Sequence, residues 1–220
     1  MSLSYLTLIV LSMLIGMGAT GYVNHELHKY SRVGISNGLT GAEAARQMLA
    51  FHHVQGVSVH MGSEGQDFFD PRSNSITLSP SAYNGRTITA TATACHEVGH
   101  ACQYAQGYMP MKARTAIVPV VNFANNAWVW LLLIGIMLNL AQLYNLAIIM
   151  YALVVLFAIV TLPVEFNASH RAMDYMGAIA LPQSEQSGAF SVLRACALTY
   201  VASALISVLQ LLWLLGQRNE

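Results

Sequence analysis

Long apolar stretches alternate with polar segments along this chain of 220 residues, and the pattern predicts a protein built around a membrane. Leu3–Val23 contains no charged residue and is long enough to cross a bilayer as a helix. Ile117–Pro163 is also free of charge, and its 47 residues (163 − 117 + 1) suit two crossings joined by a tight turn. Ala195–Gly216 is a further apolar run. We therefore expect about four transmembrane helices, with the hairpin turn at the polar residues Asn139, Gln142, Tyr144 and Asn145.

The first apolar run has the properties of a retained anchor rather than of a cleaved signal peptide. No basic segment precedes it, and it is longer than the apolar core of a typical signal peptide. No clear small-x-small cleavage site follows a short core. We expect it to remain as a transmembrane anchor.

The polar region after the first run has the pattern of a small domain with helices and strands. Thr40 and Glu43 have the spacing of a capping box, and the apolar residues that follow recur with the period of a helix. Val57–Met61 alternates between apolar and polar residues, as a half-buried strand does. After a Gly-rich turn, residues 68–74 are typical of a strand end and a turn, and Ser75–Ser79 predicts a second short strand.

Composition agrees with a membrane protein. Hydrophobic residues make up 55% of the chain and charged residues only 9%, with a mean hydropathy of +0.49, which is too apolar for an ordinary soluble domain. The formal net charge is zero and no basic patch is evident, so nothing suggests a nucleic acid as partner. Cys95, Cys102 and Cys196 have no metal-ligand spacing, and in a reducing compartment we expect small core residues at these positions.

The distribution of basic residues predicts the orientation in the membrane. Nine of the ten fall in the two segments between the first and second and between the third and fourth apolar runs, and only Arg218 falls on the other side. Because cytoplasmic loops carry the excess of Lys and Arg, both segments are expected in the cytoplasm and both termini outside. The nine residues are Lys29, Arg32, Arg46, Arg72, Arg86, Lys112, Arg114, Arg171 and Arg194.

The candidate chemistry is concentrated in His96-Glu97-Val98-Gly99-His100. Positions i and i+4 share one face of a helix, so both imidazoles can bind one Zn²⁺, and Glu97 can reach a water activated by the metal as general base. The flanking residues 87–106 contain neither Pro nor Gly outside this motif, and Gly107 is a plausible helix end. Gly99 would allow another chain segment to pack close to the site.

A helix, a small sheet and a metal-binding helix are the usual parts of a zincin domain. In that arrangement an edge strand can hold a peptide substrate by strand addition. We expect Ile76–Leu78 to be that edge.

A catalytic zinc normally takes a third protein ligand, for which Glu165 is the best candidate. It follows an apolar run almost immediately, and a carboxylate so close to the hydrocarbon is costly unless it is paired or bound to a metal. Pro163 suits the first turn of a new helix, which would place Glu165 early in that helix. His170, Asp174 and His60 remain alternatives.

The chain resembles the YugP-type membrane zinc metallopeptidases of bacteria along nearly its whole length, and more distantly the HtpX-type proteases. HtpX-type proteases place membrane spans between the two-histidine helix and a ligand glutamate. The resemblance implies Glu165 as the third ligand. The residues that carry it are Leu39–Arg46, Asp67–Arg72, Leu78–Ser79, His96–Ala101, Val118–Asn122, Thr161–Ser169 and Ala197–Ala202.

Three positions depart from these families. The YugP-type proteins often have Asp where this chain has Asn167, and Arg where it has His170. HtpX-type proteases have Asp at the position of Ser169, four residues after the ligand glutamate. The carboxylate that would orient a ligand histidine is therefore missing here or supplied elsewhere.

Together these observations predict a mainly α membrane protein with about four transmembrane helices and a small α+β zincin-like cytoplasmic domain. The expected segments are an anchor (1–23), a cytoplasmic zincin-like catalytic region (24–116), a two-span hairpin (117–162), a cytoplasmic helix carrying the third zinc ligand (163–194), and a fourth transmembrane helix with a tail (195–220).

The expected function is that of a zinc-dependent endopeptidase of the bacterial cytoplasmic membrane. His96, His100 and Glu165 would hold Zn²⁺, Glu97 would be the general base, and membrane-associated proteins or peptides would be cleaved at the cytoplasmic face. The sequence does not identify the residue that stabilises the oxyanion. The candidates are His170, Arg171 and Tyr175.

The alternative is a proteolytically inactive zinc-binding scaffold or adaptor. A metal transporter is not favoured, because a transporter should carry ligands within its spans. The isolated histidines His25, His28, His52 and His53 lie outside the predicted spans.

Overall fold

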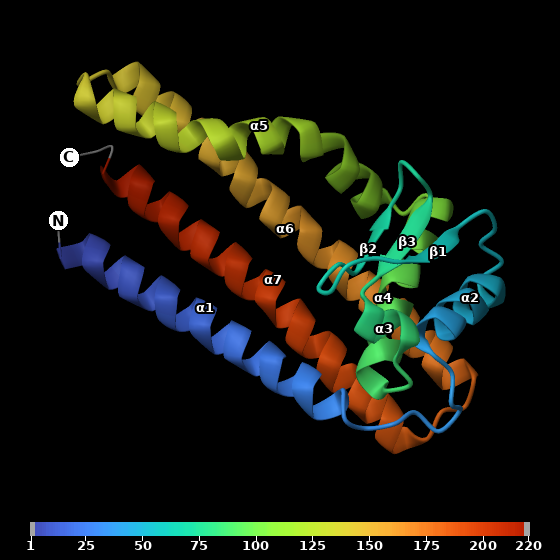
Figure 1. The fold of residues 1–220 in the computed structure, drawn as a ribbon. Coiled ribbons are helices and arrows are strands. Elements are labelled where there is room, and N and C mark those ends of the chain that lie inside the picture. The colour runs from blue at the N-terminus through green and yellow to red at the C-terminus, as the bar shows by residue number, and fades with distance from the viewer. Residues whose placement is uncertain (1–2, 218–220) are drawn as a thin grey trace.

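The computed structural model describes residues 3–217 and is mostly helical. Four long helices lie side by side, and three short strands and three shorter helices gather at one end of them (Figure 1). The elements are α1 (Leu3–Tyr30), α2 (Gly41–Phe51), β1 (Ser58–Met61), β2 (Phe68–Asp70), β3 (Ser75–Leu78), α3 (Pro80–Asn84), α4 (Ile88–Ala105), α5 (Met109–Met137), α6 (Ala141–Ala178) and α7 (Gln183–Gln217).

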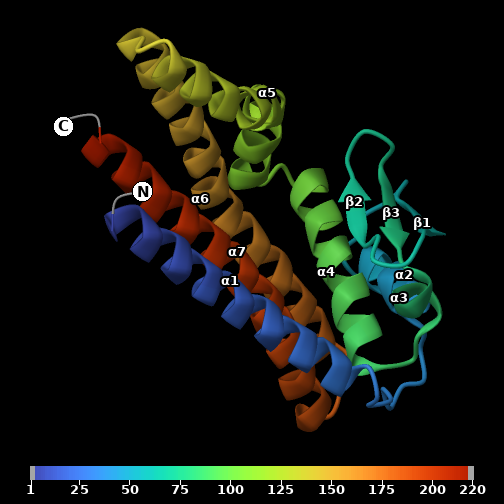
Figure 2. The same cartoon turned by 60° about the vertical axis from the view of Figure 1, so that its left-hand side comes forward.

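The apolar runs of the sequence form α1, α5, α6 and α7, which among the described residues are long and apolar enough to cross a membrane. The chain turns between α5 and α6 where the polar cluster predicted it, and Asn139 takes the left-handed backbone conformation there (φ 53°). The start of α1, the end of α7 and this turn all lie at the end of the bundle remote from the strands (Figures 1 and 2). Arg218, the one basic residue expected on that side, lies outside the described residues.

The prediction that a new helix begins at Pro163 is wrong, because α6 continues through this proline to Ala178. Proline removes one backbone donor but does not end a helix whose neighbours hold it in place. With 38 residues α6 is about 57 Å long at 1.5 Å per residue, well beyond the roughly 30 Å of a hydrocarbon core. The apolar sequence that ends near Pro163 and the polar sequence that follows it therefore belong to one continuous helix. In the same way α7 runs unbroken from Gln183, so that residues 163–194 are not a separate helix.

The prediction that Ile76–Leu78 is an edge strand is also wrong. The sheet has the order β1-β3-β2, which places β3 in the centre. β1 pairs with β3 in parallel, and β2 pairs with β3 antiparallel, with Phe69 opposite Ile76. The sequence pattern predicts a strand end and a turn at residues 68–74. In the structure Phe68–Asp70 forms the complete strand β2, which pairs with β3 and leaves β3 without a free edge. The edges are β1 and β2.

The helices of the small domain begin where local signals predict. Thr40 and Glu43 form the expected capping box at the start of α2, each side chain bonded to the other's backbone. Thr87 caps α4, and Gly107 follows the end of α4 in the left-handed conformation (φ 67°). The short helix α3, capped by Ser79, was not predicted.

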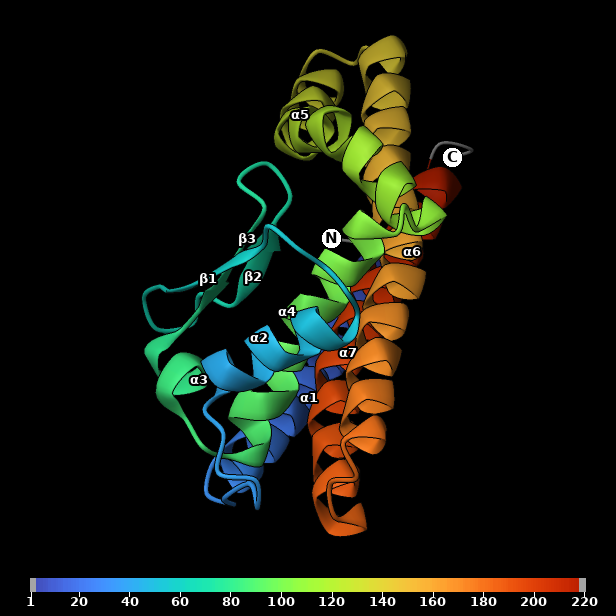
Figure 3. The same ribbon diagram turned by 90° about the vertical axis from the view of Figure 1, so that its right-hand side faces the viewer.

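The helix α4 joins the small domain to the long helices. One side of α4 packs against α2, β2 and β3, and the other packs against α6 and α7. Figures 2 and 3 show α4 between the strands and the long helices. Cys95 and Cys102 are buried in this core as expected, and burial raises the pKa of their thiols to about 12 and about 11.

Gly99 is the point of closest approach between α4 and α6. A Cβ atom at this position would lie 2.5 Å from the carbonyl oxygen and 2.9 Å from the Cα atom of Ala168. Both atoms belong to the backbone of α6, which cannot move aside as a side chain could. The expectation that Gly99 admits another chain segment is confirmed.

Replacing Gly99 by Ala is therefore expected to destabilise the protein, although Ala favours a helix more than Gly does. Overpacking costs about 1–3 kcal/mol, and against a rigid backbone we expect the upper part of this range, which is larger than the helix-propensity gain of about 1 kcal/mol. Thermal unfolding of the detergent-solubilised protein measures the change. Gly21→Ala in α1 is the control, because no atom lies within 4 Å of its added Cβ. Equal melting temperatures for the Gly99 variant and the unchanged protein would contradict the close approach.

Candidate metal centre

α4 presents His96 and His100 on one face. The two residues are one helical turn apart, and their ring centroids lie 4.7 Å from each other with the planes at 84°. His100 is buried and His96 is partly buried, so the pair is held by surrounding structure rather than by solvent.

Glu165 reaches this pair from α6. Its Oε2 atom lies 3.2 Å from Nε2 of His96 and 3.6 Å from Nε2 of His100, and its side chain is 2% exposed. One ligand atom from each of the three residues lies within 4.8 Å of the others, and of the described residues this is the one such group of three or more. The structure thus brings together the three residues that the sequence suggested as ligands.

The spacing and the donor types suit a zinc ion. Ligand atoms about 2.05 Å from a tetrahedral zinc are separated by about 3.3 Å, and the two contacts of Oε2 fall on either side of this value. Two imidazole nitrogens and one carboxylate oxygen form a donor set that occurs at catalytic zinc sites.

Each histidine is also held at its other nitrogen. The hydroxyl of Ser169 lies 3.2 Å from Nδ1 of His96, and Oε1 of Gln103 lies 3.1 Å from Nδ1 of His100. Both partners are uncharged. The carboxylate that the sequence comparison found missing is therefore replaced by a hydroxyl at the same position and an amide from α4.

Arg114 contributes a positive charge that the sequence analysis did not assign to the site. Its guanidinium lies 3.7 Å from Oε1 of Glu165, the oxygen turned away from the histidines. A basic residue three positions before the apolar run was a signal for this role. From the sequence alone, Arg114 predicts only the orientation in the membrane, because its partner Glu165 is 51 residues away (165 − 114).

Glu97 lies next to the first histidine and is 8% exposed. Among residues 3–217, no hydrogen bond or ion pair engages its carboxylate. A carboxylate in this state can accept a proton from a neighbouring water. Helix α7 packs against both α4 and α6, so it also borders the site.

The electrostatic field at the histidines favours positive charge. Burial alone would lower the pKa of His100, but the nearby carboxylates of Glu165 and Glu97 outweigh burial, so the net pKa is raised. The same two carboxylates would stabilise a divalent cation.

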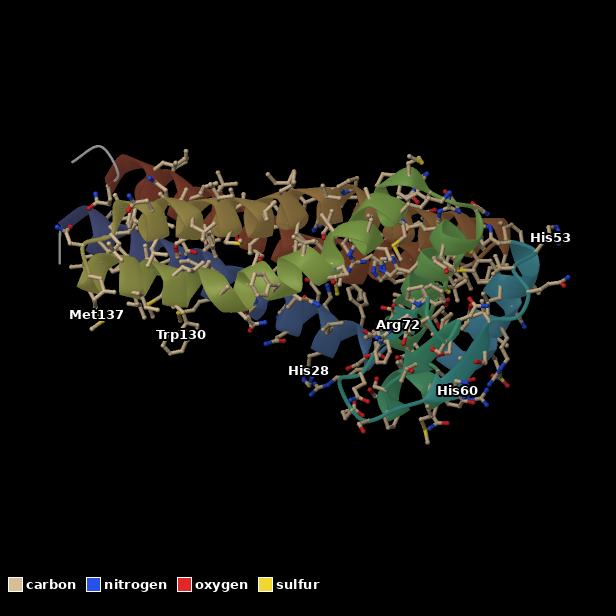
Figure 4. All side chains as sticks on the ribbon, turned by 90° about the horizontal axis from the view of Figure 1, so that it is seen from above. His28, His53, His60, Arg72, Trp130 and Met137 are labelled. Carbon is tan, nitrogen blue, oxygen red and sulfur yellow. The ribbon has the colours of Figure 1, made fainter. Side chains whose placement is uncertain are left out.

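The other ligand candidates lie elsewhere. His60 is on the edge strand β1, where its Nε2 atom bonds to Ser58, and Figure 4 shows it on the surface of the small domain. The side chain of His170 is 72% exposed and faces Asp174 on the same helix.

The oxyanion candidates have partners outside the metal group. Arg171 donates to Asn167 and Gln106, and the Tyr175 hydroxyl donates to Gln47. The third candidate, His170, lies on an exposed face, where its Nε2 atom is 3.4 Å from Asp174.

Comparison with known proteins identifies the family. A family model described as "Putative neutral zinc metallopeptidase" matches residues 5–219. The chain belongs to this family. A relative, "Putative membrane protease YugP" of Bacillus subtilis (strain 168), is 42% identical over 192 residues, which are 86% of this chain and 85% of the relative. The resemblance drawn from the sequence is confirmed. No solved structure matches the chain.

Membership of a zinc metallopeptidase family implies zinc, and it supplies a direct test of the ligand set. Replacing Glu165 by Ala is expected to abolish stoichiometric zinc binding, because it removes one of three ligands and leaves the positive charge of Arg114 unopposed. His170→Ala is the matched control on the same helix and should retain zinc. Metal analysis of the purified proteins measures both. Zinc lost from the His170 variant and kept by the Glu165 variant would reverse the assignment.

Proposed function

We propose that this chain is a membrane-embedded zinc-dependent endopeptidase. The observation that carries the proposal is the group of His96, His100 and Glu165, whose ligand atoms converge beside the carboxylate of Glu97. Among residues 3–217 this carboxylate forms no hydrogen bond or ion pair. His96, His100 and Glu165 would hold the ion, which when bound supplies the Lewis-acid polarisation of a water and of the scissile carbonyl.

The residues around the site have distinct tasks in this mechanism. Glu97 takes a proton from the attacking water and returns it to the leaving nitrogen. Ser169 and Gln103 hold the outer nitrogens of the two histidines, so that both Nε2 atoms face Glu165. Arg114 holds Oε1 of Glu165 and leaves Oε2 toward the histidines.

The edge strand β2 is the better candidate for holding a peptide substrate by strand addition. It is an edge of the sheet, it runs antiparallel to β3, and it packs against α4. The other edge, β1, packs against α2 and α3. A peptide added to β2 would lie next to the helix that carries the metal group.

The position of Glu165 along α6 supports a site at the membrane surface. Glu165 lies 24 residues (165 − 141) from the start of α6, about 36 Å at 1.5 Å per residue. A hydrocarbon core of about 30 Å that begins near the α5–α6 turn would end just before it. Substrates are therefore proposed to be membrane-associated proteins or peptides.

We further propose that the protein resides in the bacterial cytoplasmic membrane with the metal group on the cytoplasmic side. The excess of basic residues in the two segments at the sheet end of the bundle supports this orientation.

Glu97→Gln tests the catalytic assignment. The amide is nearly isosteric but cannot accept the proton, so zinc content should be unchanged while cleavage of an unfolded protein such as casein falls by at least about 100-fold. Peptide release in detergent solution measures cleavage. A variant as active as the unchanged protein would rule out Glu97 as the base. A wild-type chain that binds zinc and cleaves no protein would favour the inactive scaffold instead.

The orientation has its own test in a variant whose three native cysteines are replaced by alanine. A new cysteine at Arg72, whose side chain is 90% exposed, should react with a membrane-impermeant maleimide only after the cytoplasmic membrane is opened. A cysteine at the exposed Gln142, next to the α5–α6 turn, should react from outside in intact spheroplasts. The opposite labelling pattern would place the metal group outside the cell.

A further inference from the structure

Gln103 lies on α4 one turn after His100, and its side chain is completely buried (0% exposed). A glutamine amide has one oxygen that accepts hydrogen bonds and one nitrogen that donates two, and leaving any of these unpaired in the core is costly. All three have partners here. The partners belong to both helices that carry the metal group.

The oxygen of Gln103 faces the metal group. Oε1 lies 3.1 Å from Nδ1 of His100 and accepts its proton, which leaves Nε2 of His100 as the free nitrogen directed toward Glu165. Because the amide is neutral, it fixes the orientation of the imidazole without adding a further negative charge to the site.

The nitrogen of Gln103 faces α6. Nε2 donates to the carbonyl oxygen of Val164 at 2.7 Å and to Oδ1 of Asn167 at 3.0 Å. These two residues stand on either side of Glu165 in the sequence, one before it and two after it. Asn167 is held in turn, because its Oδ1 atom also accepts from Nε of Arg171 at 2.8 Å.

We propose that Gln103 is a positioning residue that sets Glu165 against His100, so that the ligand group is in place before the metal arrives. The inference rests on the proposed assignment of these residues as zinc ligands and goes beyond it. A single planar group orients one ligand directly and fixes the backbone that carries another. Partners of this kind at metal sites typically change metal affinity by about 10- to 100-fold when they are removed.

Two substitutions separate the contacts of Gln103. Gln103→Leu removes all three hydrogen bonds, whereas Gln103→Glu keeps the acceptor for His100 and loses both donors to α6. Both are expected to weaken zinc binding by about 10- to 100-fold in the full-length protein in detergent, measured by competition with a chelator. The visible absorption spectrum of the Co²⁺-substituted protein should also change, because it reports the geometry of the ligands.

Asn167→Ala provides a milder variant, since it removes only one partner of Gln103. If the two residues act together, the loss of zinc affinity in the double variant with Gln103→Leu should be smaller than the sum of the single losses. Gln186→Met is the matched control. Gln186 also uses its amide to bond a backbone carbonyl, that of Leu181, but it is remote from the metal group, so zinc affinity and the Co²⁺ spectrum should stay unchanged.

Two results would overturn the proposal. One is a Gln103→Glu protein with the zinc affinity and Co²⁺ spectrum of the wild type, because the bonds to α6 would then be irrelevant to the ligands. The other is a Gln103→Leu protein whose metal-free form melts at lower temperature while its zinc affinity is intact, because Gln103 would then serve only to hold the fold.

Zinc affinity is measured without a substrate. A wild-type chain that binds zinc and cleaves nothing would therefore contradict the proposed function and leave the role of Gln103 standing. A wild-type chain that binds no zinc would overturn both.

Discussion

The close approach of α4 and α6 at Gly99 sets the distances in the metal group. His96 and His100 flank this glycine on one helix, and the backbone of Ala168 faces it on the other, three residues beyond Glu165. A side chain at position 99 would push the helices apart and move Glu165 away from the histidines, whose nitrogens its Oε2 atom meets at 3.2 and 3.6 Å. Gln103 then locks the same two helices one turn further along α4. The absence of a side chain at position 99 and the two hydrogen bonds from Gln103 to α6 together define where the third ligand lies.

Charge balance explains why such a carboxylate is tolerated at the edge of an apolar helix. Burying an ionised group with no partner costs several kcal/mol, and Glu165 is almost completely buried. Each oxygen of Glu165 has partners that offset the cost of burial. Oε2 faces the two histidines, and Oε1 faces Arg114. Glu97 adds a second carboxylate, and among residues 3–217 no Lys or Arg side chain forms an ion pair with it. The two carboxylates, Glu97 and Glu165, therefore outnumber the one guanidinium, that of Arg114. A divalent cation would compensate the excess negative charge.

Much of this arrangement was predictable because the signals were local or had a strict period. The four long helices follow from uninterrupted apolar runs, the capping box of α2 from two residues three positions apart, and the two-histidine face from i, i+4 spacing. Glu165 could be predicted because a carboxylate next to the hydrocarbon is costly unless it is paired or bound to a metal. The errors came from features that depend on tertiary neighbours. Pro163 stays inside a helix because packing holds α6 together, and β3 is central because a strand of only three residues pairs with its other side. Gln103 carries no sequence signal of its own, since its role exists only once α4 and α6 have met. The position of Arg114 beside an apolar run is a signal, but its partner Glu165 is known only once α5 and α6 have met.

The hairpin of α5 and α6 also has a consequence for the order of events during synthesis. His100 leaves the ribosome 65 residues (165 − 100) before Glu165, and all of α5 and the first 24 residues of α6 (164 − 141 + 1) lie between them. A nascent chain therefore displays the two histidines while the third ligand has not yet been made, and the set is complete only after the hairpin has been inserted and has folded back. Under the proposed function, the chain acquires its ability to cut proteins late in its own biogenesis, after it has been committed to the membrane.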